Sequence, residues 1–275
     1  MPNWCSNWAR FSGPNDLITK DSITQLKNRL HKTWILESNA WWPSLKESPY
    51  TTEEVDEAKD AGRLCDYGKL FFARLLEYED LGATCKVENY GYNESVAHIG
   101  TKWDPTYDIN SDADEFITVY LQSAWSPPER GLLIVARKYG LDLVVEYEEG
   151  GCDFAGMLKY DAKTDSVRTA SMRYLAYRFL ESDDYEVPDC PEALHTEVAR
   201  FIFDEWDLTE ADSLSNDAVK DILDEIRGIR DIGDLLCDPI PASEWVKGKL
   251  EEGTRVMASI QEYVTQMVKT ADADT

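Results

Sequence analysis

A few charged side chains lie beside predicted strand ends and turns, where polar groups could converge on a small ligand. They are Lys102, Asp104, Glu148, Glu149 and Asp153. Paired carboxylates can hold a divalent cation, so one hypothesis is a small-ligand-binding or metal-dependent nucleotide-processing enzyme. Each residue also has an ordinary structural explanation, because Asp104-Pro105 and Glu149-Gly150 are turn-forming pairs and Lys102 suits a surface strand. The sequence contains no catalytic signature, and we assign no catalytic residue.

Cysteine and histidine spacing does not predict a metal site. The six cysteines are widely and irregularly spaced without a C-x-x-C pair, and the three histidines do not cluster. Such cysteines are expected to be free thiols in a reducing compartment. No apolar run approaches the length of about 18 residues that a membrane span needs, and the start of the chain lacks the regions of a signal peptide. We therefore expect a cytoplasmic protein without a metal or other cofactor.

Charge is the most unusual property of the chain. The 275 residues are 43% hydrophobic, enough for a sizeable core, but carry 53 acidic against 28 basic residues, a net charge of −25. A field of this sign repels nucleic acid and anionic membranes and attracts basic surfaces. We therefore expect neither direct nucleic-acid binding nor membrane binding. Solubility alone, or the acidic surface of a halophilic protein, is the simpler alternative.

Hydrophobic periodicity predicts an α+β arrangement in the first part of the chain. We expect helices over 21–31 and from Pro127 or Pro128 to 139, and strands over 3–12, 95–103, 115–124, 141–148 and 152–160. With 34–90 set aside as a helical, aromatic insertion, this order is the split βαβ, or ferredoxin-like, antiparallel sheet with one extra strand.

Local signals support several of these elements. Ile23, Leu26 and Leu30 share one face of the first helix. Thr51-x-x-Glu54 has the form of a capping box for a helix to about residue 61, and a second helix is expected over 66–78. Ser126 suits the N-cap of the helix that follows it.

From Ser166 onward the pattern becomes helical, with four apolar stripes, the last over 243–269. We therefore divide the chain into a ferredoxin-like domain, 1–165, and an acidic all-helical region, 166–275.

The acidic charge is concentrated in this second region. Residues 181–238 contain 19 acidic and four basic residues, a net charge of −15. Rigid helices that carry carboxylates every one or two turns can imitate part of the field of DNA. The residues expected to form this acidic surface are Asp204, Glu205, Asp207, Glu210, Asp212, Asp217, Asp221, Asp224, Glu225, Asp231 and Asp234. A merely solvated helix face is the alternative.

Four motifs occur in order in the first 160 residues. They are Met1-Pro2-Asn3-Trp4-Cys5-Ser6-Asn7, Gly100-Thr101-Lys102-Trp103-Asp104, Trp125-Ser126-Pro127-Pro128 and Gly151-Cys152-Asp153-Phe154-Ala155-Gly156. In these motifs the chain resembles the Api92-like, or YubB, ferredoxin-domain family of phages and conjugative plasmids. The resemblance implies the fold and a mobile-element origin, and it supplies no catalytic residue.

Three functions remain open. The first is a non-enzymatic phage or plasmid accessory protein whose acidic, DNA-mimic-like surface inhibits a host nucleic-acid-binding defence protein, such as a restriction or CRISPR complex. The second is the enzyme or small-ligand module described above. The third is a phage structural or assembly protein, with the tryptophan-rich segment 34–50 at an interface. The oligomeric state is not predicted.

Overall fold

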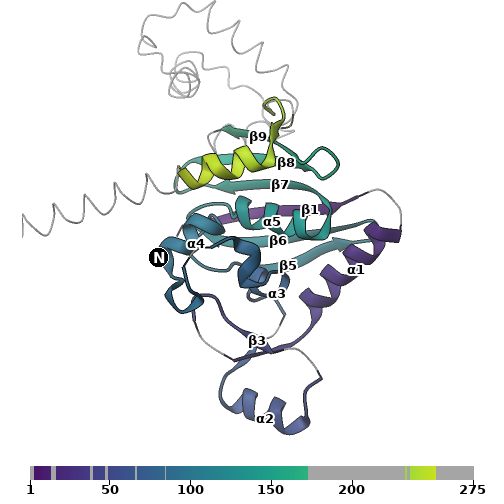
Figure 1. Cartoon of the computed structure of the whole chain (residues 1–275), viewed down its shortest axis with the longest axis vertical. Helices are drawn as coiled ribbons and strands as arrows, with labels where there is room; N and C mark the ends of the chain where they lie inside the picture. The colour runs from purple at the N-terminus through teal and green to yellow at the C-terminus, as the bar shows by residue number, and fades with distance from the viewer. Residues whose placement is uncertain are drawn as a thin grey trace, which may run out of the picture.

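The computed structural model describes the chain over residues 3–13, 17–37, 40–46, 49–65, 67–83, 85–172, 233 and 236–251. Its main feature is an antiparallel sheet with the strand order β10-β9-β8-β7-β1-β6-β5. Figure 1 shows β9 toward one edge of this sheet and the small unit that contains α2 beyond the other edge. None of the described helices is both long enough and apolar enough to span a membrane.

The centre of the sheet has the ferredoxin-like arrangement that the sequence predicts. The unit consists of β1 (Trp4–Ser12), α1 (Leu17–His31), β5 (Thr106–Asp112), β6 (Phe116–Ala124), α5 (Glu129–Tyr139) and β7 (Asp142–Glu149). The last strand lies beside the first, and the third lies between the first and the second. This is the βαββαβ order with all neighbouring strands antiparallel.

The pattern of buried residues follows the hydrophobic periodicity that the sequence predicts. Cys5, Ala9 and Phe11 of β1 are completely buried, while the alternate positions face outward. Ile23 and Leu26 of α1 are also completely buried. The core therefore lies between the sheet and the helices that cover one of its faces.

The sheet continues past residue 165. The strands β8 (Phe154–Asp161) and β9 (Ser166–Met172) extend it beyond β7, and β10 (Ile240–Pro241) pairs with β9. The expectation of helix from Ser166 is therefore wrong for 166–172. The reason is a tight turn, in which the Asp161 carboxylate accepts the backbone N–H of Lys163 and Thr164 and forces a hairpin. Beyond β10, residues 242–251 form a helix.

That helix belongs to the same core. Ala242 and Trp245 are buried and contribute to the hydrophobic cluster between the sheet and the helices. In Figure 1 the helix lies along β7 and β8. Part of the predicted C-terminal region therefore packs directly on the ferredoxin-like domain.

The insertion between α1 and β5 adds a second, small sheet and several short helices, some of which pack into the main core. A three-stranded sheet of order β3-β2-β4 stands beside short helices. The elements are β2 (Trp34–Leu36), β3 (Leu45–Lys46), α2 (Thr52–Asp60), β4 (Leu64–Cys65), α3 (Phe71–Leu75), η1 (Tyr78–Leu81), η2 (Val87–Asn89) and α4 (Tyr92–His98). The capping box at Thr51 and Glu54 is confirmed, because both reciprocal hydrogen bonds are present.

Two predictions in the insertion are wrong. No strand forms over 95–103: residues 95–98 belong to the helix α4, at whose start the Glu94 carboxylate accepts the Gly91 N–H at 3.1 Å, and 99–103 form a turn and bends. The second strand of the sheet is β5 instead, so the insertion reaches residue 105 rather than 90. The helix expected over 66–78 shrinks to α3, because Leu70 before it takes a left-handed conformation and Leu76 after it is extended.

A buried arginine fastens this insertion to the core. The Arg74 side chain is 0% exposed. Its guanidinium donates to the carbonyl oxygens of Lys69 at 2.6 Å, Cys65 at 3.0 Å and Leu30 at 3.4 Å, and also to that of Lys32. These carbonyls come from the end of α1, from β4 and from the loop before α3. One cation therefore satisfies backbone acceptors from three separate segments.

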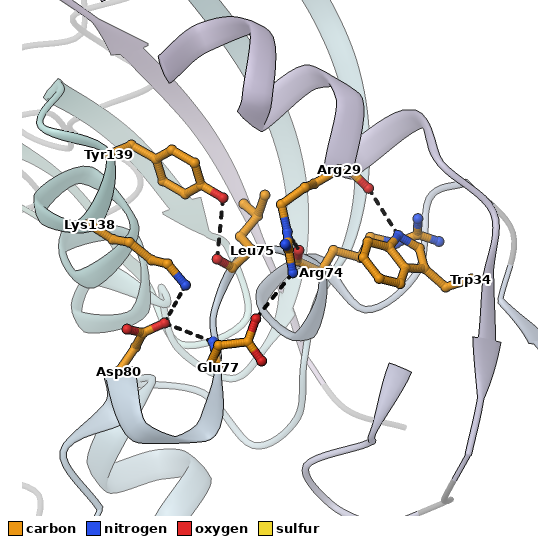
Figure 2. Close-up of polar contacts among 8 residues, drawn as sticks. All are labelled: Arg29, Trp34, Arg74, Leu75, Glu77, Asp80, Lys138 and Tyr139. Atoms are coloured by element: carbon orange, nitrogen blue, oxygen red, sulfur yellow. Dashed lines mark hydrogen bonds and ion pairs between the residues drawn. The ribbon is translucent and has the colours of Figure 1, made fainter. Parts of the chain in front are cut away.

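Figure 2 shows further polar contacts around Arg74 and the start of η1. Arg29 of α1 donates to the Arg74 carbonyl and lies 3.4 Å from a carboxylate oxygen of Glu77. The Lys138 ammonium of α5 lies 2.5 Å from the Asp80 carboxylate of η1. The insertion is therefore held against both long helices of the core.

We expect Arg74→Leu to lower the free energy of unfolding by roughly 3 kcal/mol or more, because several buried carbonyls lose their donor. Urea unfolding monitored by circular dichroism measures this change. Arg63→Ala is the control, since Arg63 makes a partly exposed ion pair with Glu57 and should cost less than about 1 kcal/mol. Equal losses in the two variants would contradict the role given to Arg74.

Candidate functional site: the sheet end where the motifs meet

The four sequence motifs meet at one end of the sheet. The Trp125 N–H donates to the Asn3 carbonyl at 3.0 Å, and the Asn3 amide donates to the Cys152 sulfur at 3.4 Å. The Thr101 hydroxyl donates to the Ala124 carbonyl at 2.8 Å. Segments about 150 residues apart in the chain therefore form one surface.

A buried polar cluster stands beneath this surface. Asn7 is completely buried, and its amide donates to the Cys5 carbonyl at 2.9 Å, the Ser123 hydroxyl at 2.9 Å and the Leu121 carbonyl at 3.3 Å. Burial raises the pKa of the Cys5 thiol well above its usual range. Cys5 is therefore an inert, protonated core residue, and the cluster locks β1 to β6.

Aromatic rings form the outer layer of the site. The rings of Trp4 and Trp103 make an edge contact with centroids 6.1 Å apart, and the Lys102 ammonium lies 4.8 Å from the Trp103 centroid. Trp125 is 52% exposed and has φ of 75°. Positive φ is strained for a bulky residue, and such strain concentrates at functional positions. Exposed aromatic rings are suited to binding a partner rather than to catalysing a reaction.

Ser126 does not have its expected role. The helix α5 begins at Glu129, its N-cap position is Pro128, and no side chain caps it. The Ser126 hydroxyl instead donates to the Gly100 carbonyl at 2.5 Å. Ser126 therefore joins two motifs rather than starting the helix.

Gly100 is needed where these two motifs touch. It has φ of +101°, and a Cβ atom would lie 3.1 Å from the Pro127 carbonyl oxygen. Both the backbone conformation and the contact exclude a side chain.

Gly100→Ala should lower the free energy of unfolding by about 1–3 kcal/mol. Gly248→Ala is the matched control, because Gly248 lies in the 242–251 helix with open space around it, and alanine there should stabilise by up to about 1 kcal/mol. Thermal melts of the two variants measure these changes. If Gly100→Ala leaves the free energy of unfolding unchanged, the close contact between Gly100 and the Pro127 carbonyl is refuted.

Asp104 caps the N-terminus of the helix α3, from which it is distant in the sequence. Its two carboxylate oxygens accept the backbone N–H groups of Phe72 and Ala73, each at 2.8 Å, at the start of α3. The residue is half-buried, while its carboxyl group is enclosed, and this burial raises the pKa of Asp104 from 3.8 to about 7. The two N–H groups and the nearby Arg74 charge oppose that rise.

Asp104 also lines a pocket of about 380 Å³, together with Trp41, Trp103, Leu36, Ala40, Pro43 and Leu70. The walls are mainly apolar, so the pocket is suited to a small apolar or aromatic group.

The raised pKa of Asp104 makes stability depend on pH. The unfolded chain loses this proton near pH 3.8, whereas the folded chain keeps it to about pH 7, so the unfolded state binds fewer protons in between. The free energy of unfolding should therefore fall as pH rises through this window, by at most about 1.4 kcal/mol per pH unit from this group. Urea unfolding of Asp104→Asn, which cannot titrate, should show a flatter profile. Parallel profiles for the two proteins would contradict this assignment.

The other candidate carboxylates have structural roles. Glu149 is 4% exposed and accepts the N–H groups of Gly151, at 2.9 Å, and Cys152 in the hairpin turn. Asp153 has φ of 55° in that turn. Glu148 lies on the outward face of β7. Across the described ranges, no three histidine, cysteine or acidic residues are placed to hold a metal ion.

The eleven residues predicted to form the acidic surface, Asp204 to Asp234, lie outside the described residues. The sequence does not predict the roles of two other groups. Arg74 lies within the helix expected over 66–78. Glu129 is buried and lies 3.7 Å from Lys249 of the 242–251 helix. An acidic residue directly after Pro-Pro was the available signal for a first-turn carboxylate.

Comparison with known proteins relates part of this chain to one family. Residues 102–172, which contain β5 to β9, match the family model described as the ferredoxin-like domain in Api92-like protein. The uncharacterized protein YubB of Escherichia coli (strain K12) is 27% identical over 116 residues, which are 40% of this chain and 77% of YubB. The crystal structure of protein api92 from Yersinia pseudotuberculosis aligns with a TM-score of 0.33 and 9% identity, over 59% of this chain and 95% of that one.

Proposed function

We propose that this chain, which carries the ferredoxin-like domain of the Api92-like family in residues 102–172, is a non-enzymatic binding protein. Its partner would be a host nucleic-acid-binding defence protein, whose basic surface it occupies in place of DNA. A phage or plasmid accessory protein acting in the host cytoplasm would have this role. The observation that carries the proposal is the net charge of −15 over residues 181–238.

Electrostatics favours such a partner. A total charge of −25 accelerates encounters with basic surfaces and slows encounters with nucleic acid. The nucleic-acid groove of a defence protein is such a basic surface, because it must neutralise phosphates. A protein that fills this groove with carboxylates competes directly with the nucleic acid.

The first domain supports a binding role rather than catalysis. Asp104 and Glu149 were the candidate carboxylates nearest to turns, and both are engaged with backbone N–H groups. In both residues each carboxylate oxygen already accepts a backbone N–H group, which leaves these carboxylates poorly placed to bind a metal ion.

A charge-reversal experiment tests the proposal. The tagged full-length chain is used to isolate host proteins that bind at low salt and leave at high salt. Affinity for the isolated partner should fall steeply with ionic strength. The triple variant Asp217→Lys, Asp221→Lys and Asp224→Lys should lose at least about tenfold in affinity.

The matched control reverses three exposed carboxylates of α2, Glu53, Asp56 and Asp60, which carry the same charge outside the acidic region. Its affinity should change much less. Salt-independent binding, or equal losses in the two triple variants, would sink the proposal.

Two alternatives have specific support. Asp104, with its raised pKa, lines the apolar pocket, which favours the small-ligand form of the second hypothesis; its other form is a metal-dependent nucleotide-processing enzyme. Metal-dependent nucleotide turnover that is lost in Asp104→Ala and Asp153→Ala would favour this reading. Trp41 is 47% exposed in the insertion, which favours a phage assembly role. Co-purification with virions would identify that role.

A further inference from the structure

The outward face of the main sheet carries a row of aromatic rings. The helices α1, α3 and α5 and residues 242–251 contribute to the core on the opposite face. On β1, β6 and β7 the outward positions are half-buried or exposed from Trp4 to Ser12, Phe116 to Gln122 and Asp142 to Glu148. Among the described residues, no helix buries these positions. We call this surface the open sheet face.

The rings lie on the two central strands. Trp8 and Tyr120 are cross-strand partners, with centroids 5.4 Å apart. The Tyr120 hydroxyl is 3.1 Å from that of Ser6, which fixes the ring. Trp4, 47% exposed, continues the row to the sheet end where it meets Trp103. The aromatic surface of the motif site is therefore continuous with the open sheet face.

One edge of this row is acidic. Glu146 is the β7 partner of Trp8, and Glu148 is the β7 partner of Ser6. A ring beside carboxylates is the combination that binds guanidinium and ammonium groups, because the π-face and the negative charges attract the same cation. The chain itself contains such a contact on this face, with the Arg10 guanidinium 3.9 Å from the Phe116 centroid.

Single-stranded nucleic acid is the other class of ligand that such rings could stack. Aromatic residues on a four-stranded sheet bind bases in some RNA-binding domains. Here the phosphates would lie beside Glu146 and Glu148, on a chain with a net charge of −25. Charge complementarity therefore selects a cationic partner.

We propose that the open sheet face binds arginine or lysine side chains of a basic protein partner, which stack on Trp4 and Trp8 between the rings and the carboxylates of Glu146 and Glu148. This inference rests on the proposed function for the class of partner. It adds a second contact surface, separate from residues 181–238, and it gives the motif tryptophans a role.

A short peptide of alternating arginine and glycine tests this surface on the full-length chain. Isothermal titration gives the affinity, and tryptophan indole N–H signals in NMR spectra report which rings the peptide touches. Trp4→Ala and Trp8→Ala should each weaken binding about tenfold, whereas Trp8→Phe should retain most of it. Glu146→Gln with Glu148→Gln should weaken binding and reduce its salt dependence.

Ile18→Ala is the control, because Ile18 is a large apolar residue that is 77% exposed on α1, away from the open sheet face, and its peptide affinity should be unchanged. Thermal melts verify that each variant is folded. If Trp4→Ala and Trp8→Ala bind the peptide as Ile18→Ala does, or if oligothymidine binds more tightly than the peptide, the proposal is overturned.

The triple reversal at Asp217, Asp221 and Asp224 separates this inference from the proposed function. A variant that still shows peptide-induced shifts at Trp8 keeps the open sheet face as a site, even if the defence partner is no longer bound. If the triple reversal abolishes peptide binding and Trp8→Ala does not, the sheet-face proposal fails and the acidic-region proposal stands.

Discussion

A single buried guanidinium ties the end of α1 to two segments of the insertion. Arg74 carries its charge into the interior, where an unpaired ion would cost several kcal/mol, and it is balanced by carbonyl dipoles from α1, β4 and the loop before α3. A helix of five residues such as α3 has no stability of its own. It exists because Arg74 anchors it from within and Asp104 binds its first N–H groups.

This arrangement determines the position of the motif site. Asp104 can reach α3 only if the loop from Gly100 crosses the end of β6, and there Thr101 and Ser126 join it to the neighbouring motif. Candidate catalytic residues such as Asp104 therefore have a structural role, because they join segments of the fold by hydrogen bonds. The features that remain for binding a partner are the exposed tryptophans, the outward face of the sheet and the acidic character of the whole chain.

The sequence predicts those parts of the fold whose signals are local. β1, β6 and β7 alternate cleanly, and α1 and α5 carry apolar stripes, so each could be recognised from a short window. β5 is an exposed edge strand whose only apolar residues are Tyr107 and Ile109. It could therefore not be recognised from a short window of sequence. For the site, the motifs identify the right segments, but neither the partners of Arg74 nor the role of Asp104 could be predicted. The contacts of Arg74 and the capping role of Asp104 both depend on hydrogen bonds to backbone groups that are distant in the sequence. Hydrophobic periodicity carries no information about such contacts.

The position of β1 has a consequence for biosynthesis. This strand lies inside the sheet between β6 and β7, but these neighbours begin only at Phe116 and Asp142. A ribosome that adds about 5–20 residues per second needs roughly 5–20 s to reach β6 after finishing β1. During that interval a strand whose inward face is mainly apolar has no partner in the nascent chain, and the helix-rich insertion is made first. The sheet of this protein therefore closes late in synthesis, because its first strand must wait for two partners that are made much later.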